Sequence, residues 1–263
     1  TAPEAAPAPP ATAPPEQAPA PTGSAPRTGL GQAPFGPSPL RGVRRLTAEA
    51  MTQSWSTIPH ITGMDEIDAT PLLETRRRLK EQAGEAGANL TPLALLVAAA
   101  ARALRRYPLV NAGVAPDGQS VTVHERCNIG VAVATDDGLI VPILTDADRR
   151  GVLELADEIA RLSAAARRKQ LSAAELRGGT FTITNYGAIG GRFATPLIRP
   201  GEAGILGFGA IRPRPLVVDG EVTARPTLPV VFSADHRIID GDLSVAFQEH
   251  VLSLLAEPLL MLL

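Results

Sequence analysis

Apolar residues recur along the chain with two different spacings, one typical of helices and one typical of strands. Helical spacing predicts five helices, at residues 41–56, 70–82, 93–107, 152–168 and 243–255. Alternating or short apolar runs predict extended segments near 58–67, 120–124, 129–134, 139–144, 180–184, 205–208, 216–218, 222 and 230–232. Because helices and strands interleave without a repeating strand–helix–strand unit, the pattern predicts an α+β fold, a mixed β-sheet flanked by helices.

Two turns stand out in this pattern. Asp136 to Gly138 separate the runs at 129–134 and 139–144, and an Asp-Gly pair in that position favours a tight hairpin turn. A glycine-rich loop follows the strand at 180–184. Its glycines do not form a dinucleotide-binding fingerprint, and we expect them to permit a tight turn with close backbone approach; they are Gly187, Gly190 and Gly191.

The N-terminal segment differs in composition from the rest of the chain. The first 39 residues hold 12 of the 25 prolines and 10 alanines, with only Glu4, Glu16 and Arg27 charged. Such a segment cannot bury enough apolar surface to offset the entropy lost on ordering. We therefore predict a flexible linker at 1–38 and one compact domain at 39–263. Because the chain begins within linker-like sequence, we interpret it as a fragment that lacks upstream modules.

Composition also excludes several classes of partner. The net charge of −2 gives no sign of a general nucleic-acid binder. No apolar run reaches the roughly 18 residues of a membrane span, and the N-terminus lacks a signal-peptide layout. The four histidines lack metal-ligand spacing, so no metal is predicted. The lone Cys127 excludes an internal disulfide and fits a reducing compartment, and the abundant arginine and alanine favour a GC-rich bacterial genome, so we expect a cytoplasmic bacterial protein.

The most informative stretch is SADHRIIDGD, from Ser233 to Asp242. It follows an apolar run and precedes the last predicted helix, so His236 is expected at a strand-to-helix turn, presented to a substrate and not buried. Histidine can accept and donate a proton near neutral pH. Asp240 suits the N-cap of the last helix. It could also shape the site around His236, and the two roles are compatible.

The pattern His236-x-x-x-Asp240-Gly241 resembles the active-site signature of the dihydrolipoyl acyltransferases, the core subunits of the 2-oxo acid dehydrogenase complexes. Chloramphenicol acetyltransferases and peptide-synthetase condensation domains share both that pattern and the fold of the dihydrolipoyl acyltransferases. The resemblance runs from about Leu40 to the C-terminus, through the segments LRGVRRLTAEAM, STIPHITGMDEID, LTPLALLVAAAARALRRYPLVNAG, NIGVAVATDDGLIVPIL, GGTFTITNYGAIGG, TPLIRPGEAGILGFGAI and EPLLMLL. The lipoyl and peripheral-subunit-binding domains that precede this core in the family are absent from the chain.

The resemblance implies a chloramphenicol acetyltransferase-like, trimer-forming fold that moves an acyl group between a dihydrolipoyl arm and coenzyme A. It implies His236 as the general base that removes the thiol proton. Thr184, in FTITNYG, matches the Ser or Thr that stabilises the oxyanion. Asp240 is implied as the third catalytic residue, one that shapes the site without shuttling protons. Arg44, through an ion pair with Asp240, and Gly241 are expected to support the site.

The resemblance also implies partners. The base and the hydroxyl would come from neighbouring subunits of a homotrimer, with a channel at their interface. Coenzyme A would be a substrate, and the lipoyl group would sit on a separate domain; the sequence does not single out the residues that bind the coenzyme's phosphates. A 2-oxo acid decarboxylase and a dihydrolipoyl dehydrogenase would be the other components. The apolar tail at 258–263 either folds back on its own subunit or joins trimers into a cubic or dodecahedral shell.

Alternatives to an active transferase of this class remain open. They are a non-catalytic scaffold core, a free-standing acetyltransferase for a small alcohol or amine, and a condensation domain. Retention of His236, Thr184 and Asp240 favours an enzyme, and the long linker counts against both a free-standing acetyltransferase and a condensation domain. Within the family, GAIGG and ADHRIIDG favour a branched-chain or acetyl group, whereas Thr at position 184 is also frequent in succinyl-transferring members.

Other candidate residues have structural interpretations beside functional ones. His60 either borders the channel or is structural, and the structural interpretation is favoured. His124 and His250 have no partner motif and are interpreted as surface or packing residues. Cys127 could be imagined as an acyl-accepting nucleophile, but no basic group is visibly arranged around it, so a packed thiol is favoured. Ser233 does not belong to a serine-hydrolase elbow, because no Gly-x-Ser-x-Gly occurs.

Overall fold

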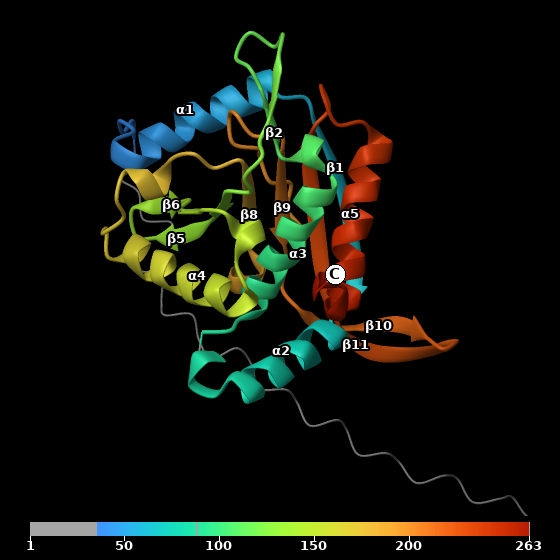
Figure 1. Ribbon diagram of the computed structural model, residues 1–263. Coiled ribbons are helices and arrows are strands. Elements are labelled where there is room, and N and C mark those ends of the chain that lie inside the picture. Colours follow the sequence, from blue (N-terminus) through green and yellow to red (C-terminus); the bar gives the residue numbers. More distant parts are fainter. Residues whose placement is uncertain (1–35, 88, 263) are drawn as a thin grey trace, which may run out of the picture. The chain divides into compact units, whose positions relative to one another are not determined.

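The computed structural model describes residues 36–87 and 89–262 (Figure 1). The predicted linker at 1–38 therefore lies almost entirely outside the described residues, as does Leu263. Within the described part, five α-helices occur, each within two residues of its predicted bounds: α1 Gly42–Thr57, α2 Thr70–Ala83, α3 Pro92–Arg106, α4 Val152–Arg167 and α5 Gly241–Ala256. Proline occupies the first turn of both α2 and α3, where a missing backbone N–H costs nothing.

A seven-stranded mixed sheet forms the centre of the described chain. Its order is β1-β11-β9-β8-β4-β7, with β10 paired to β11. The pairs β4–β8 and β8–β9 are parallel and the others antiparallel, which confirms the predicted mixed sheet. Its strands are β1 His60–Asp68, β4 Ile129–Val131, β7 Ile143–Leu144, β8 Phe181–Asn185, β9 Gly204–Phe208, β10 Arg212–Val218 and β11 Glu221–Asp235. Two small sheets add β2 Ala112–Val114 with β3 Val121–Val123, and β5 Val133–Thr135 with β6 Gly138–Ile140.

Helices α3 and α5 pack in front of the sheet and bury its apolar face (Figure 1). Helix α3 is almost wholly buried because it is built largely of alanine and leucine. Phe247 of α5 contacts Phe181 of β8 and Phe232 of β11, with ring centroids 6.0 and 4.7 Å apart. Side chains alternate along a strand, so Thr182, Thr184 and Ser233 lie on the opposite face from these aromatic residues.

The predicted hairpin is confirmed. Pairs Val133↔Ile140 and Ile129↔Leu144 keep one register on both sides of an interruption at Ala132. The backbone N–H of Ala132 instead donates to the carbonyl of Ile183. The hairpin thus belongs to the main sheet at its base and forms its own small sheet near the turn.

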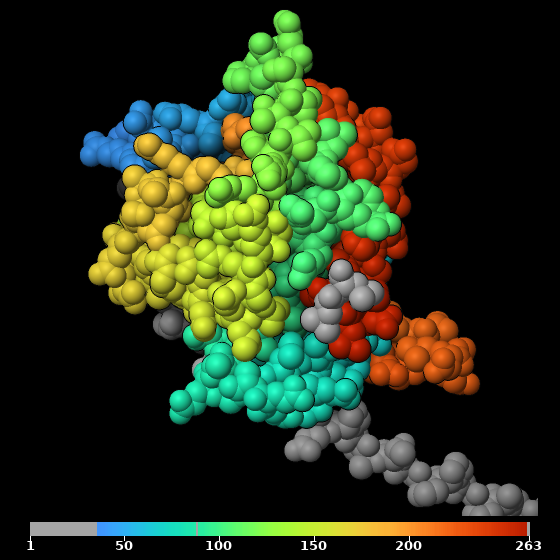
Figure 2. Space-filling model, viewed as in Figure 1, coloured from blue at the N-terminus to red at the C-terminus, as the bar shows by residue number. Residues whose placement is uncertain are grey.

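The separate strands predicted at 222 and 230–232 are wrong, because β11 runs without a break for 15 residues. Pro226 and Pro229 lie within this strand. The carbonyl of Pro226 accepts from Ala69 N–H and that of Pro229 from Gly209 N–H, so both residues still contribute hydrogen bonds at the strand. With β10, the first half of β11 forms a hairpin that projects from the rest of the molecule (Figure 2).

A helix that spans a membrane must be both long and apolar, and no single described helix meets both requirements. The bent pair of α2 and α3, which turns by 105°, meets them only when the two are taken together.

Candidate active site

His236 lies, as predicted, in the turn between β11 and α5. Its backbone N–H donates to the carbonyl of Pro59 at 2.9 Å, which ties the turn to the start of β1. Its side chain is 44% exposed. The imidazole is therefore held on a fixed backbone and remains accessible to a substrate.

Two neighbours of His236 that the sequence analysis did not single out form a buried ion pair. The carboxylate of Asp235 is 1% exposed. Arg237 donates to it from Nε, at 2.9 Å to Oδ1, and from Nη2, at 2.6 Å to Oδ2. These bonds raise the pKa of Arg237 further above its usual range. The sequence did contain a signal for this pair, because an acidic residue and an arginine flank the candidate base His236.

Asp240 is the N-cap residue of α5, but its side chain makes no capping hydrogen bond. The predicted N-cap position is thus confirmed, but the prediction that the Asp240 carboxylate caps the helix is wrong. Asp240 Oδ1 lies 3.7 Å from His236 Nδ1, and the Asp240 side chain is 85% exposed. The carboxylate therefore faces the imidazole without a full hydrogen bond.

The predicted ion pair between Arg44 and Asp240 is absent from the described part of the chain. Helix α1, which carries Arg44, packs on β6, and the guanidinium lies beside Gly138 in the hairpin turn. Gly241 begins α5 with open space where a side chain would project. Within one chain the Arg44 guanidinium therefore lies near the hairpin turn and makes no ion pair with Asp240.

Thr184 lies next to the C-terminal end of β8, half-buried, on the face opposite Ile183. The glycine-rich loop follows it. A side chain at Gly187 would collide with the backbone of Gly209, and Gly190 has a positive φ of 91°. The loop thus makes the close backbone approach that the glycines predicted.

Thr184 and His236 are far apart within one chain. Thr184 pairs with Gly207 of β9, which pairs with Val231 of β11. His236 is five residues beyond Val231, just past the end of β11, so the two side chains are separated by about 16 Å along the strands and about 10 Å across them, or roughly 19 Å. One chain therefore supplies the two groups to two different places.

A buried carboxylate lies between these two places. Glu202 accepts a hydrogen bond from Thr182 Oγ1 at 2.6 Å, and its other oxygen lies 3.5 Å from Arg199 Nη1. Burial raises the pKa of Glu202 to about 7, against the lowering effects of Thr182 and Arg199. No sequence motif indicated this group.

The structure supports the structural interpretation of His60. Its Nδ1 is 2.8 Å from the carbonyl of Ile58, and its Nε2 is 3.1 Å from the backbone nitrogen of Ile198. Ile198 N–H must donate, so Nε2 accepts and Nδ1 carries the proton. His60 thus joins two segments and has no free nitrogen for catalysis.

Cys127 is a buried thiol, as favoured. Burial, with a smaller effect of Asp148, raises its pKa to about 12. A thiol this hard to ionise is a poor nucleophile. Among the described residues, no group of three or more His, Cys, Asp or Glu side chains is placed to hold a metal.

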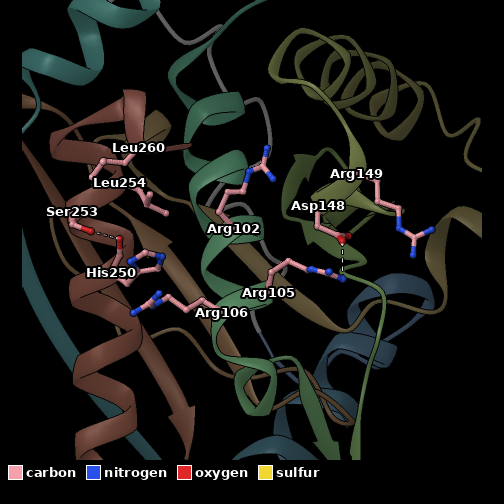
Figure 3. Close-up of a pocket in the computed structure, with 9 residues that line it drawn as sticks. All are labelled: Arg102, Arg105, Arg106, Asp148, Arg149, His250, Ser253, Leu254 and Leu260. Atoms are coloured by element: carbon pink, nitrogen blue, oxygen red, sulfur yellow. Dashed lines mark hydrogen bonds and ion pairs between the residues drawn. The ribbon is translucent and has the colours of Figure 1, made fainter. Parts of the chain in front are cut away.

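A groove of about 890 Å³ lies elsewhere (Figure 3). Arginines of α3 and His250 of α5 line it. Arg102, Arg105 and Arg106 leave α3 in different directions, and Arg105 pairs with Asp148 at 3.6 Å (Figure 3). His250 is ten residues beyond Asp240, or about 15 Å along the helix axis, so the groove is separate from the His236 turn.

The mixed sheet presents a histidine just after β11 and a threonine hydroxyl near the end of β8, the two groups expected of an acyltransferase catalytic domain. The chain belongs to the family described as 2-oxoacid dehydrogenases acyltransferase (catalytic domain), whose model matches residues 34–263. The family predicted from the motifs is confirmed.

Relatives agree with this family. The chain is 40% identical over 232 residues, 88% of its length, to the dihydrolipoyllysine-residue acetyltransferase component of the pyruvate dehydrogenase complex of Bacillus subtilis. The same component of Staphylococcus aureus is also 40% identical over 88% of this chain. The chain spans about half the length of these curated relatives, 52% and 54%.

One similar solved structure bears on the choice of site residues. The dihydrolipoamide acetyltransferase of Azotobacter vinelandii is 34% identical, with a TM-score of 0.82 over 92% of this chain and 99% of that chain. That work concerns the catalytic roles of a serine, a histidine and an asparagine. They are spaced 52 and then 4 positions apart, which is also the spacing of Thr184, His236 and Asp240. The cubic core of a pyruvate dehydrogenase multienzyme complex superimposes equally well, with a TM-score of 0.82 and 35% identity over 92% of this chain and 99% of that chain.

Proposed function

We propose that this chain is the catalytic core of an acetyltransferase that moves an acetyl group between a dihydrolipoyl arm and coenzyme A in a 2-oxo acid dehydrogenase complex. The observation that carries the proposal is the placement of Thr184 and His236 at the same spacing as the hydroxyl and histidine studied in the Azotobacter relative. The acetyl-transferring names of the relatives favour acetyl over branched-chain or succinyl groups.

His236 is the proposed general base. Its Nδ1 faces the carboxylate of Asp240, which favours a proton on Nδ1 and leaves Nε2 as the acceptor. Nε2 takes the proton of the coenzyme thiol, and the sulfur attacks the carbonyl carbon of the acetyl-dihydrolipoyl thioester. When the tetrahedral intermediate collapses, the bond to the dihydrolipoyl sulfur breaks, and that sulfur receives the proton from the imidazolium.

Thr184 is the proposed donor to the oxyanion of that intermediate. A single preorganised donor contributes about 3 kcal/mol to such a transition state. Thr184→Val should therefore lower kcat by about 10²-fold with nearly unchanged KM, whereas Thr184→Ser should remain active. Equal activity of the two variants would remove Thr184 from this role.

Two neighbouring subunits build each site in this proposal. Because Thr184 and His236 lie at opposite ends of the sheet in one chain, a homotrimer in which the subunits meet at these ends brings the two groups together. The similarity to a cubic core favours a larger shell built from such trimers. The lipoyl domain, the 2-oxo acid decarboxylase and the dihydrolipoyl dehydrogenase are the proposed partners, since the curated relatives are components of a complex.

The proposed location is the bacterial cytoplasm. The relatives are bacterial, and the free, buried thiol of Cys127 fits a reducing compartment.

A coupled assay tests the function. Acetyl-, isobutyryl- and succinyl-CoA are each offered with dihydrolipoamide, and transfer is expected to be fastest with acetyl-CoA. His236→Ala should lower turnover at least ~10³-fold in an assembled protein. An assembled wild-type protein without transfer would favour the non-catalytic scaffold, and near-normal turnover of His236→Ala would remove His236 as the base.

A further inference from the structure

The residues on either side of His236 are joined by a two-bonded ion pair. Arg237 donates from Nε and Nη2 to the two oxygens of Asp235, and its backbone N–H donates to Oδ1 at 3.1 Å. This fork arrangement fixes orientation as well as distance. The guanidinium is 32% exposed, whereas the carboxylate is buried, so Arg237 covers Asp235 from the solvent side.

The backbone of the turn is tied at several further points. Asp235 N–H donates to the carbonyl of Ala203 at 2.9 Å, and the Asp235 carbonyl accepts from Ile238 and Ile239 N–H at 3.1 and 3.0 Å. His236 N–H is held by Pro59. Main-chain bonds thus anchor the turn to the residues just before β1 and β9, and the ion pair adds a side-chain contact between the two residues that flank His236.

We infer that Asp235 and Arg237 are positioning residues for His236, with Arg237 acting through Asp235 and not through contact with substrate. This inference rests on the proposed role of His236 as base. Without the fork, the buried carboxylate loses its countercharge and must find another partner or a proton. The turn then moves, and a displacement of about 1 Å at a reacting group can cost about 10²-fold in rate.

Arg237→Lys and Asp235→Asn test the inference in the assembled protein. Lysine keeps the charge but cannot form the planar fork, and asparagine keeps the shape but not the charge. Both variants should lower kcat by about 10- to 10²-fold, with KM for coenzyme A changed by less than about twofold. The double variant should lose little more than the worse single one, because the two residues act as one unit.

Arg161→Lys is the matched control. Arg161 makes the same fork on Glu158, with Nε and Nη2 each 2.8 Å from a carboxylate oxygen, but on α4. The kcat of the Arg161→Lys variant should equal that of the wild type. Hydrogen exchange followed by mass spectrometry adds a readout that does not need activity. Peptides covering residues 234–240 should exchange faster than in the wild type in Arg237→Lys, and at the wild-type rate in Arg161→Lys.

The outcomes separate this inference from the proposed function. Wild-type kcat in both Arg237→Lys and Asp235→Asn overturns the inference, and so does a loss confined to KM, which would make Arg237 a binding residue. A wild-type protein without coenzyme A-dependent transfer overturns the proposed function instead. In that case hydrogen exchange alone tests the inference, and a wild-type exchange rate of residues 234–240 in Arg237→Lys overturns it as well.

Discussion

Mixing two inactive variants should restore activity if each site takes its base from one subunit and its hydroxyl from the next. The variants are His236→Ala and Thr184→Val. In one chain the two positions are roughly 19 Å apart along the register of β8, β9 and β11. A proton acceptor and an oxyanion donor must both lie about 3 Å from the reacting thioester, so the pair within one chain cannot serve the same reaction.

The expected recovery follows from random assembly. When equal amounts of the two variants form trimers, a site is complete only if its histidine comes from Thr184→Val and its threonine from His236→Ala. About a quarter of the sites meet both conditions in a cyclic trimer. Homotypic assemblies keep at most about 1% of wild-type turnover, set by the ~10²-fold loss expected for Thr184→Val. The unfractionated mixture should therefore be about 25-fold more active than the better parent, and tandem-purified mixed trimers, in which about a third of the sites are complete, about 30-fold more active.

Co-expression with two affinity tags and tandem purification gives the mixed assemblies, and mass spectrometry gives the subunit ratio. Transfer from acetyl-CoA to dihydrolipoamide is then measured per site, with post-purification mixing of the two homotypic assemblies as the control. An activity equal to the mean of the parents, in assemblies proved to be mixed, would refute the shared site.

Three further predictions concern the buried carboxylate, the core and the tail. Burial raises the pKa of Glu202 from 4.5 to about 7, so the stability that its protonated form contributes is complete below about pH 4.5 and is lost as the pH rises through 7. The free energy of unfolding of Glu202→Gln should therefore exceed that of the wild type by ~3 kcal/mol at pH 8 and by little at pH 4. Thermal unfolding of both proteins at the two pH values measures this difference. Phe247→Ala removes the ring that contacts Phe181 and Phe232 and should cost about 3–5 kcal/mol in denaturant unfolding, a loss below 1 kcal/mol contradicting the packing. Deletion of residues 259–263 should convert a larger shell into trimers that keep some activity; light scattering that finds an unchanged shell contradicts the role of the tail, and a monomeric parent contradicts the shared site.

The tail also shows where sequence patterns leave alternatives. Its apolar composition indicated burial but not the partner. In the structure Met261 is 7% exposed and packs on its own core, whereas Leu259 is 68% exposed. Folding back therefore accounts for part of the tail, and Leu259 remains available to another subunit. Composition alone could not divide the segment, because both residues have apolar side chains that favour burial.

Local structure was predictable because it follows from short-range periodicity and turn chemistry. The five helices, the hairpin at Asp136 to Gly138 and the exposed turn at His236 all depend on residues within a few positions of one another. The errors arose where long-range pairing decides the outcome. Strand β11 continues through Pro229 because neighbouring strands support it on both sides, and Arg44 faces the hairpin turn because α1 packs on β6.

The site itself depends on that long-range pairing. The motif places His236 and Asp240 within one turn, and the structure places the Asp240 carboxylate near the imidazole. Thr184 and His236 were both recognisable as chemistry-bearing residues, but only the register β8–β9–β11 shows that one chain holds them at different ends of the sheet. In the proposed mechanism, each chain therefore holds an incomplete site at each end, and a cyclic trimer completes every site with a single kind of contact. Assembly is a condition of catalysis in that proposal, so the mixed-variant experiment tests the mechanism and the quaternary structure together.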